Sequence, residues 1–276
     1  DNYSLGIVLE PVEGLTITYD KWSIEKSDTI GLFGEENHIA LDLLRRLSSG
    51  GNCASVATNP AVIRESDVPT DALPLFEAAG LCPFGDVVRV DDNYTNLDER
   101  TVEGTDIGVY YELETGLGEF GFRYVGTFMD KYEQQAGGQA AELVAAKASG
   151  ALPSSVPVVG FSSLIGQDGN PERKDTVRAS WSKDDWAVRM TGLRYGDFVQ
   201  NLSNGQVYPI PSMTTFNLSV DYSFDMIGDI DSRIRLGVNN VQDERAPLAD
   251  DSFGYFADQH RDLGRYYYVD LRFRLL

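Results

Sequence analysis

Few residues in this chain have the types and spacing that acid–base, nucleophilic or metal chemistry needs. The sequence has 276 residues and only two histidines, His38 and His260. Neither stands in a His-Glu-x-x-His motif, and no serine and carboxylate are recognisably placed with either histidine as a catalytic triad requires. We place His38 in a solvated loop and His260 in the last long loop. The sequence therefore predicts no catalytic residue, and we expect that the protein is not an enzyme.

The acidic residues are numerous but do not form a recognisable ligand set. The chain has 43 Asp and Glu against 23 Lys and Arg, a formal net charge of −20. This charge makes nucleic acid an improbable partner, and we expect none. Acidic loops can bind divalent cations, but no Asp, Asn and Gly spacing here defines a site. We predict no metal site and no cofactor, and we interpret most of the acidity as a solvated surface.

The two cysteines, Cys53 and Cys82, lie in one long segment without strand periodicity. An even number of cysteines in an exported protein favours a disulfide, and two free thiols are the alternative. We predict that Cys53 and Cys82 are bonded. The chain begins at Asp1 without an initiator methionine or a signal peptide, so we expect a mature piece or a fragment.

The elements that would position these residues alternate with a period of two, as β-strands do. The clearest stretch has Leu218, Val220 and Tyr222 on one side of the chain and Ser219 and Asp221 on the other. The closing stretch, residues 266–276, is similar, with Leu275 in its apolar phase. We predict about nine strands, separated in part by turns such as one near Gly228. They are residues 2–10, 15–25, 105–114, 120–128, 176–181, 186–190, 215–224, 233–239 and 266–275.

The connections between these strands alternate between short and long. The long ones are residues 26–90, 131–172, 201–211 and 242–263, and helical spacing appears within them at 39–47, 71–79 and 139–148. In the first of these helices we expect Leu43 and Leu44 on one side and Asp42 on the other. A soluble β-sandwich shows the same alternation within strands, but it does not sort its loops by length. Transmembrane barrels do, with short periplasmic turns and long extracellular loops.

The sequence therefore predicts an all-β fold, an antiparallel transmembrane β-barrel segment with long extracellular loops that contain short helices. No run of about 18 apolar residues exists that could form a membrane-spanning helix. Aromatic residues near strand ends are typical of the interfacial girdles of such barrels: Trp22, Phe120, Trp181, Trp186, Phe224 and Tyr267. We expect these residues to face the membrane: Phe216, Leu218, Val220, Tyr222, Tyr267, Val269, Leu271 and Phe273.

Several segments together resemble one family, the TonB-dependent receptors. LEPVEGLTITYDKWSIE resembles the family's Pro-containing periplasmic turn and the strand after it, and GRYYYVDLRFRLL resembles its final strand. NLDERTVEGTDIGVYYEL matches another strand motif at Asn96, Gly104 and Asp106. RLGVNNVQDERAP matches the exit of the penultimate strand at Asn239, Asn240, Asp243 and Pro247.

The resemblance implies a bacterial outer-membrane location and a plugged barrel of about 22 strands, of which this chain would supply the last nine. Residues 1–276 would be the C-terminal portion of the barrel, with residues 26–90 and 131–172 as long extracellular loops. The plug domain is not recognisable here. The implied partners are the TonB complex, through that plug, the N-terminal part of the receptor, outer-membrane lipid and lipopolysaccharide, and a small nutrient ligand.

The implied function is active uptake of a nutrient, with a passive porin or a structural outer-membrane barrel as the alternative. The acidic loops disfavour polyanionic ligands, so a glycan, a peptide or a cationic or metal-bearing ligand is preferred. Aromatic residues in the long connections could stack on a sugar ring or a siderophore: Phe84, Tyr94, Tyr132, Tyr208, Phe253 and Tyr255. Loop aromatics also commonly pack loops on one another, so both interpretations stay open.

Overall fold

The computed structural model describes residues 1–202, 205–226 and 230–273. The predicted turn near Gly228 and the predicted final residues Leu275 and Leu276 lie outside this part of the chain. None of the helices among the described residues has the length and apolarity that crossing a membrane requires.

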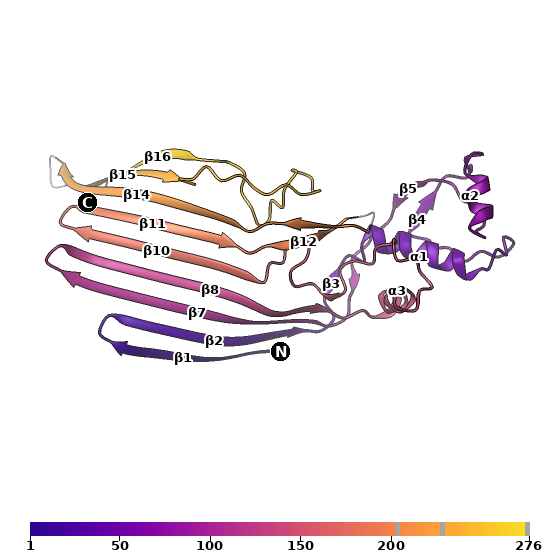
Figure 1. Ribbon diagram of the computed structural model, residues 1–276, viewed down its shortest axis with the longest axis horizontal. Helices are drawn as coiled ribbons and strands as arrows, with labels where there is room; N and C mark the ends of the chain where they lie inside the picture. Colours follow the sequence, from indigo (N-terminus) through magenta and orange to yellow (C-terminus); the bar gives the residue numbers. More distant parts are fainter. Residues whose placement is uncertain (203–204, 227–229, 274–276) are drawn as a thin grey trace.

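One large antiparallel sheet dominates the fold (Figure 1). All nine predicted strands are present, and each pairs with its neighbours in chain order. The order is β1 (Asn2–Val12), β2 (Leu15–Lys26), β7 (Arg100–Thr115), β8 (Gly118–Gln134), β10 (Arg173–Lys183), β11 (Trp186–Tyr195), β14 (Met213–Met226), β15 (Ile230–Asn239) and β16 (Tyr266–Phe273). A short strand, β9 (Ser162–Ser163), also pairs with β8. The predicted all-β antiparallel fold is confirmed.

The two ends of the sheet carry very different connections (Figure 1). At one end the described connections, residues 13–14, 116–117 and 184–185, are tight turns, and Gly14 and Asp184 take positive φ values there, 78° and 49°. At the other end lie the long connections, residues 27–99, 135–172, 196–212 and 240–265. The predicted alternation of short and long connections is therefore confirmed, with boundaries shifted by up to nine residues.

The long connections contain all the remaining elements. The first holds β3 (Ile30–Gly31), α1 (Glu35–Ser48), β4 (Val62–Arg64), α2 (Leu73–Ala78), β5 (Val87–Val90) and β6 (Thr95–Asn96). The second holds α3 (Gly138–Ser149), and the third holds the hairpin of β12 (Phe198–Asn201) and β13 (Val207–Ile210). The three predicted helices are confirmed, and α1 begins four residues earlier than its apolar spacing indicates.

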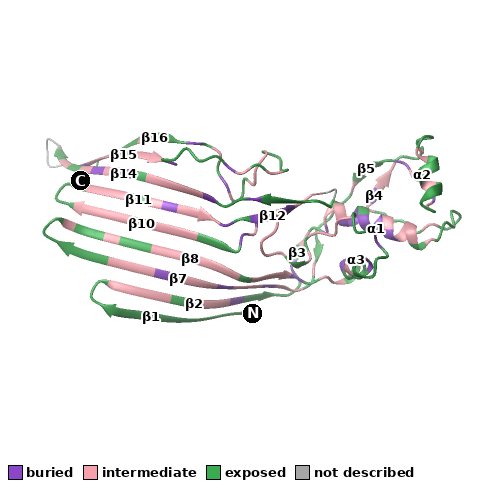
Figure 2. Ribbon diagram, in the orientation of Figure 1, coloured by how far each residue is buried: buried purple, intermediate pink, exposed green. Residues whose placement is uncertain are grey.

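The main sheet has one apolar and one polar face, and many of its large apolar side chains are exposed. Figure 2 shows that β1 is exposed along its length. Val188, Val220, Leu236 and Val269 lie side by side on β11, β14, β15 and β16. Leu236 and Val269 are exposed, whereas the polar side chains of Ser219 and Asp221 on the opposite face are buried. A soluble protein buries its apolar face, so this inversion indicates a sheet whose apolar side meets a nonaqueous surrounding.

The polar face carries a cluster of charges around Asp221. This carboxylate lies 2.8 Å from Arg235 Nε and 3.4 Å from Arg233 Nε, and it also accepts a hydrogen bond from Arg189. The arginines come from β11 and β15, on the two sides of β14. Charges this close are stable only when they are paired, and Asp270 adds a second carboxylate 3.8 Å from Arg233.

The apolar core of the protein lies outside the main sheet, among the long connections. Leu41 and Leu44 of α1 pack with Leu143 and Ala146 of α3 and with Leu152. We call this assembly, residues 27–99 and 135–161, the loop unit. Because α1 and α3 come from different connections, the loop unit is a separately packed body at the end of the sheet (Figure 1).

The two edges of the main sheet are open. The order of the sheet begins with β1 and ends with β16, and no pairing between these two strands exists among the described residues. Since every neighbouring pair in the nine-strand path is antiparallel, β1 and β16 run in the same direction. The described part of the chain therefore forms an open sheet rather than a closed barrel.

Candidate functional site

The first candidate region is the loop unit, which is organised around the buried carboxylate of Asp42. This carboxylate lies 2.8 Å from Arg46 Nε and 3.1 Å from Arg64 Nε, and it accepts the Asn59 N–H at 2.9 Å. We expected Asp42 on the polar side of its helix, away from Leu44, but it is fully buried. The reason is that Arg64, from β4, supplies a counter-charge that the helix alone does not reveal.

Phe84 lies between the two arginines that bind Asp42. The guanidinium carbons of Arg46 and Arg64 lie 4.6 Å and 4.4 Å from the centre of its ring. The ring also meets Phe76 edge-on at a centroid distance of 4.5 Å. These cation–π and aromatic contacts give Phe84 a packing function. Its contact with a ligand stays a prediction.

His38 is not in a solvated loop, so that prediction is wrong. It belongs to α1 and is buried, with Nε2 3.2 Å from an Asp92 carboxylate oxygen and Nδ1 3.1 Å from the Asn59 amide nitrogen. Phe33 packs edge-on against its ring. Asp92, Asn59 and Phe33 therefore fix His38 in the loop unit, where it ties α1 to the segment that follows β5.

The predicted disulfide is confirmed. Cys53 and Cys82 are bonded, and their Cα atoms lie 5.4 Å apart. The bond closes the part of the first connection that contains β4 and α2. Asn37 adds a link between the two connections of the loop unit: its side chain donates to the Val159 carbonyl at 2.9 Å and accepts the Val159 N–H at 3.1 Å.

The other predicted ligand-binding aromatics are spread over several elements. Tyr94 and Phe253 are strongly exposed, and Tyr208 lies exposed on β13. Tyr132 is part of β8, with the Arg100 guanidinium over its ring. Tyr255 contacts Phe253, the one ring contact within this set among the described residues. The structure therefore does not gather the six aromatics into one pocket, and their function in binding stays a prediction.

The second candidate region is the last connection, residues 240–265, which is held in place at several points. Asp262 accepts hydrogen bonds from Arg245 at 2.7 and 2.5 Å and from the Ala246 N–H at 2.9 Å. The Arg245 guanidinium and this N–H hold the pKa of Asp262 at about 2. Phe198 of β12 meets Phe256 edge-on at 5.0 Å. The last connection is thus docked against the β12–β13 hairpin.

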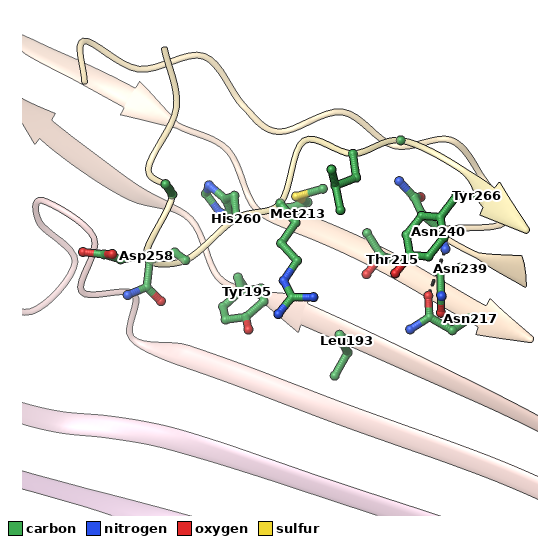
Figure 3. Close-up of a pocket in the computed structure, with 15 residues that line it drawn as sticks. Leu193, Tyr195, Met213, Thr215, Asn217, Asn239, Asn240, Asp258, His260 and Tyr266 are labelled. Carbon is green, nitrogen blue, oxygen red and sulfur yellow. Dashed lines mark hydrogen bonds between the residues drawn. The ribbon is translucent and has the colours of Figure 1, made fainter. Parts of the chain in front are cut away.

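A cavity of about 430 Å³ lies between the last connection and the polar face of the sheet, and we call it the wall cavity (Figure 3). Tyr195 of β11, Thr215 and Asn217 of β14, and Asn239 of β15 line it from the sheet. Residues 257–261, 263 and 264 line it from the last connection. Cavities of a few hundred Å³ are of the size that small ligands occupy.

His260 lies in the wall of this cavity. It is 2% exposed and stacks parallel to the Phe198 ring at 6.0 Å, with Tyr195 edge-on at 6.1 Å. Neither of its ring nitrogens has a hydrogen-bond partner among the described residues. Burial lowers the pKa of His260, so the ring is held in its neutral form. The prediction that His260 lies in the last long loop is confirmed.

The sequence analysis did not predict the wall cavity as a binding site. Its lining joins Tyr195, Asn239 and His260, which are far apart in the sequence and come together only through strand pairing and loop docking. The one available signal was the Asn239–Asn240 pair, which we interpreted only as a family motif. No group of three or more His, Cys, Asp or Glu side chains that could hold a metal ion occurs in the described ranges.

The predicted membrane-facing residues all lie on the apolar face of the sheet. Leu218 and Tyr267 both flank Val238 of β15, and Val220 and Val269 both flank Leu236. Their contact with lipid stays a prediction.

The prediction for Trp22 is wrong: its ring lies over Gly104 on the polar face, where a Cβ atom at position 104 would come within 2.3 Å of it. This contact explains the glycine of the motif.

The comparisons with known proteins identify the family. The β-barrel family described as TonB dependent receptor-like matches residues 1–241. No curated protein sequence matches the chain. Among solved structures, the siderophore receptor PirA from Acinetobacter baumannii is similar with a TM-score of 0.51 and 14% identity over 98% of this chain. A variant of the ferric enterobactin receptor PfeA from Pseudomonas aeruginosa is similar with a TM-score of 0.51 and 16% identity over 98%.

The similarity to the two solved receptors shows the fold. The chain spans only 31% of the length of the PirA chain and 30% of the PfeA chain, which agrees with an open sheet that is one part of a larger barrel. The family consists of transport receptors of the outer membrane rather than enzymes. From the family match over residues 1–241 and the nine-strand antiparallel sheet, we conclude that this chain belongs to the β-barrel family of TonB-dependent outer-membrane receptors.

Proposed function

We propose that this chain is the C-terminal portion of a receptor that captures a nutrient with its long connections and imports it with energy from the TonB complex. The observation that carries the proposal is the sorting of the two ends of the sheet. One end has tight turns, and the other carries the loop unit (Figure 1). The wall cavity also lies toward the end with the long connections. In a barrel of this class the long connections face the outside of the cell, where a nutrient is first met.

The two faces of the sheet support the membrane part of the proposal. Leu236, Val269 and Leu271 on the exposed apolar face would contact the lipid chains, and the lipopolysaccharide of the outer leaflet would border the long connections. The cluster of Asp221 with Arg189 and Arg235 would then lie in a wet interior. Charges inside a membrane protein are tolerated where they face such an interior.

The open edges support the proposal that further strands of the same receptor complete the barrel. Unpaired backbone N–H and C=O groups are too costly in lipid, so β1 and β16 each need a neighbouring strand there. We propose that the N-terminal part of the receptor supplies these strands and the plug domain through which TonB acts. The long connections, including residues 26–90 and 131–172, would then be its extracellular loops.

The nutrient is proposed to be a glycan, a peptide or a metal–siderophore. The net charge of −20 disfavours a polyanionic ligand. The siderophores named for PirA and PfeA belong to those proteins, and at 14% and 16% identity they do not extend to this one. The alternative function is a passive porin or a structural barrel. It requires a barrel closed by pairing of β1 with β16, a pairing that the described residues do not show.

Uptake measurements in cells test this proposal. A strain without the receptor gene and a strain without TonB should both lose accumulation of the nutrient at low external concentration, and restoring each gene should restore it. Candidate nutrients come from growth screens on glycans, peptides and iron–siderophore complexes. If removal of the receptor abolishes uptake but removal of TonB leaves it unchanged, the protein is a passive porin and the proposal is wrong.

A further inference from the structure

The wall cavity is rich in hydrogen-bonding groups that the protein does not use. The half-exposed side chains of Thr215, Asn239 and Gln259 line it and make no hydrogen bond within the described part of the protein. Both ring nitrogens of the buried His260 also lack a hydrogen-bond partner among the described residues. Buried polar groups in proteins are nearly always paired, and those that are not call for a missing partner. His260 therefore calls for a partner, and the half-exposed Thr215, Asn239 and Gln259 offer further donors and acceptors to the same ligand.

The charges of the lining narrow the class of that ligand. Among the residues that line the cavity, Asp258 and Arg261 carry opposite charges, and the others are neutral. An anionic ligand such as a phosphate or a catecholate would need several cationic side chains in the lining. A cationic ligand would need an excess of carboxylates. A lining with no net formal charge fits a neutral ligand best.

The donors and acceptors narrow it further. A neutral imidazole such as His260 donates from one nitrogen and accepts at the other, and the amides of Asn239 and Gln259 do both. A hydroxyl group likewise donates one hydrogen bond and accepts others. Tyr195 and Tyr266 add aromatic surface to the lining, against which the C–H face of a sugar ring can pack (Figure 3). The lining thus matches a compound with many hydroxyl groups on an otherwise apolar ring.

We infer that the wall cavity is a binding subsite for a neutral, hydroxyl-rich ligand of the sugar class. This inference rests on the proposed function, because it assigns the nutrient class and places a subsite on the polar face of the barrel wall, beneath the last connection. The subsite would hold about one or two sugar rings in its 430 Å³, and the β12–β13 hairpin would keep its roof in place. His260 and Thr215 would bind hydroxyl groups directly.

Saturation-transfer NMR on the intact receptor, purified from outer membranes in a detergent without a sugar headgroup, tests the inference. The neutral probes are glucose, N-acetylglucosamine, maltose and cellobiose. The charged comparison probes are glucose 6-phosphate, glucuronate and ferric enterobactin. We expect binding of at least one neutral sugar, and weaker or no binding of its charged analogues.

Three variants locate the binding. His260→Phe keeps the buried ring and its packing but removes both nitrogens, and Thr215→Val removes one hydroxyl at constant shape. Each should weaken sugar binding about tenfold, the effect of about one lost hydrogen bond to a ligand. Thr214→Val is the matched control, because Thr214 directly precedes Thr215 in β14 and lies on the opposite face of the sheet. It should bind sugar as the unmodified receptor does.

The inference is overturned if no neutral sugar binds, if the charged probes bind better, or if His260→Phe and Thr215→Val bind sugar as well as Thr214→Val. Folding of each variant is checked by the heat-modifiable migration of the barrel in gels, so that loss of structure is not mistaken for loss of binding. The assay does not use TonB. Sugar binding without TonB-dependent uptake would refute the proposed import while leaving the subsite in place. TonB-dependent uptake that is unchanged by His260→Phe would refute the subsite while leaving the proposed import in place.

Discussion

Gln200 and Asp250 are joined by a pair of hydrogen bonds that connects the β12–β13 hairpin to the last connection. Gln200 Nε2 donates to the Asp250 carbonyl oxygen at 2.7 Å, and the Asp250 N–H donates to Gln200 Oε1 at 2.9 Å. One buried amide side chain thus satisfies both backbone groups of one loop residue. Neighbouring β-strands pair the N–H and C=O groups of a residue in the same way, but here one side chain supplies both partners.

Removing this pair should loosen the roof of the wall cavity. Gln200→Leu takes away both hydrogen bonds and leaves the Asp250 peptide group unpaired, at a cost of about 1–3 kcal/mol. We expect backbone amides of residues 246–262 to exchange hydrogen about tenfold faster or more. Hydrogen exchange with mass spectrometry measures this. Gln139→Leu, at an exposed position of α3, is the control, and equal exchange in the two variants would show that the pair does not hold the roof.

The buried carboxylate of Asp42 should determine the stability of the loop unit. Asp42→Asn keeps the shape of the side chain but leaves Arg46 and Arg64 without a counter-charge, and breaking a buried pair in this way costs about 3–5 kcal/mol. Thermolysin should then cut within residues 27–99 while the strands of the sheet stay resistant. Asp71→Asn changes an exposed carboxylate of the same connection and should leave the digestion pattern unaltered. Equal resistance of both variants would argue against a structural function of Asp42.

The disulfide should stabilise the same unit through the unfolded state. It joins residues 29 positions apart, and closing a loop of that length removes about 3–4 kcal/mol of chain entropy from the unfolded connection in the simplest estimate. The double variant Cys53→Ser, Cys82→Ser should show faster proteolysis around α2, and reduction of the unmodified protein should have the same effect. If reduction accelerates proteolysis equally in the double variant, the bond is not the cause.

The apolar face should be intolerant of charge, and the polar face tolerant. Val220→Arg places a guanidinium on the face that carries Leu218 and Tyr222, and it should cost about 2–4 kcal/mol if this position is near the middle of the bilayer. Ser219→Arg places the guanidinium on the opposite, polar face, where it is not forced into lipid, and should cost less. Reversible unfolding of the receptor in lipid vesicles measures both. Equal costs would contradict the assignment of the faces.

The docking of the last connection should weaken in mild acid. Burial lowers the pKa of His260 below its ordinary value of 6.5, so the undocked loop binds a proton more readily than the docked one. The docked state is therefore fully favoured above pH 6.5 and loses stability as the pH falls below it. Hydrogen exchange of residues 250–264, corrected for the intrinsic rate, should show increasing opening from pH 7 to pH 5. His260→Phe, which cannot bind the proton, should abolish this trend, and persistence of the trend in that variant would assign it to another group.

The strands could be predicted because lipid and water impose alternation on them. Phe120, Phe122 and Tyr124 already define β8, yet this strand continues to Gln134, beyond the predicted end. Past residue 128 the polar residues Asp130, Lys131 and Glu133 fall on both faces of the strand. The alternation of apolar and polar side chains therefore stops, although the pairing of β8 with β7 continues to Gln134. The predicted strand, residues 120–128, is shorter than β8 for this reason.

The candidate site could be predicted much less well, because it depends on contacts across long stretches of sequence. Arg64 reaches Asp42 from 22 positions away, and Gln200 reaches Asp250 from 50. Neither pairing leaves a periodic signal. His38 shows the limit clearly: its neighbours in sequence indicated solvent, whereas Asp92, 54 positions later, completes its burial. The disulfide could be predicted, since cysteines in an exported protein restrict their own partners, and so could the place of His260 in the last connection, though not its contacts.

The shared core of α1 and α3 has a consequence for how receptors of this kind can diversify. Leu41 and Leu143 belong to two different connections, and Asn37 ties them with hydrogen bonds to Val159. A recombination event that replaced only one connection would leave half of an apolar core without its complement. The two loops are therefore expected to be inherited as one module, and a chimaeric receptor should keep its fold when both are transplanted together and lose it when either is moved alone.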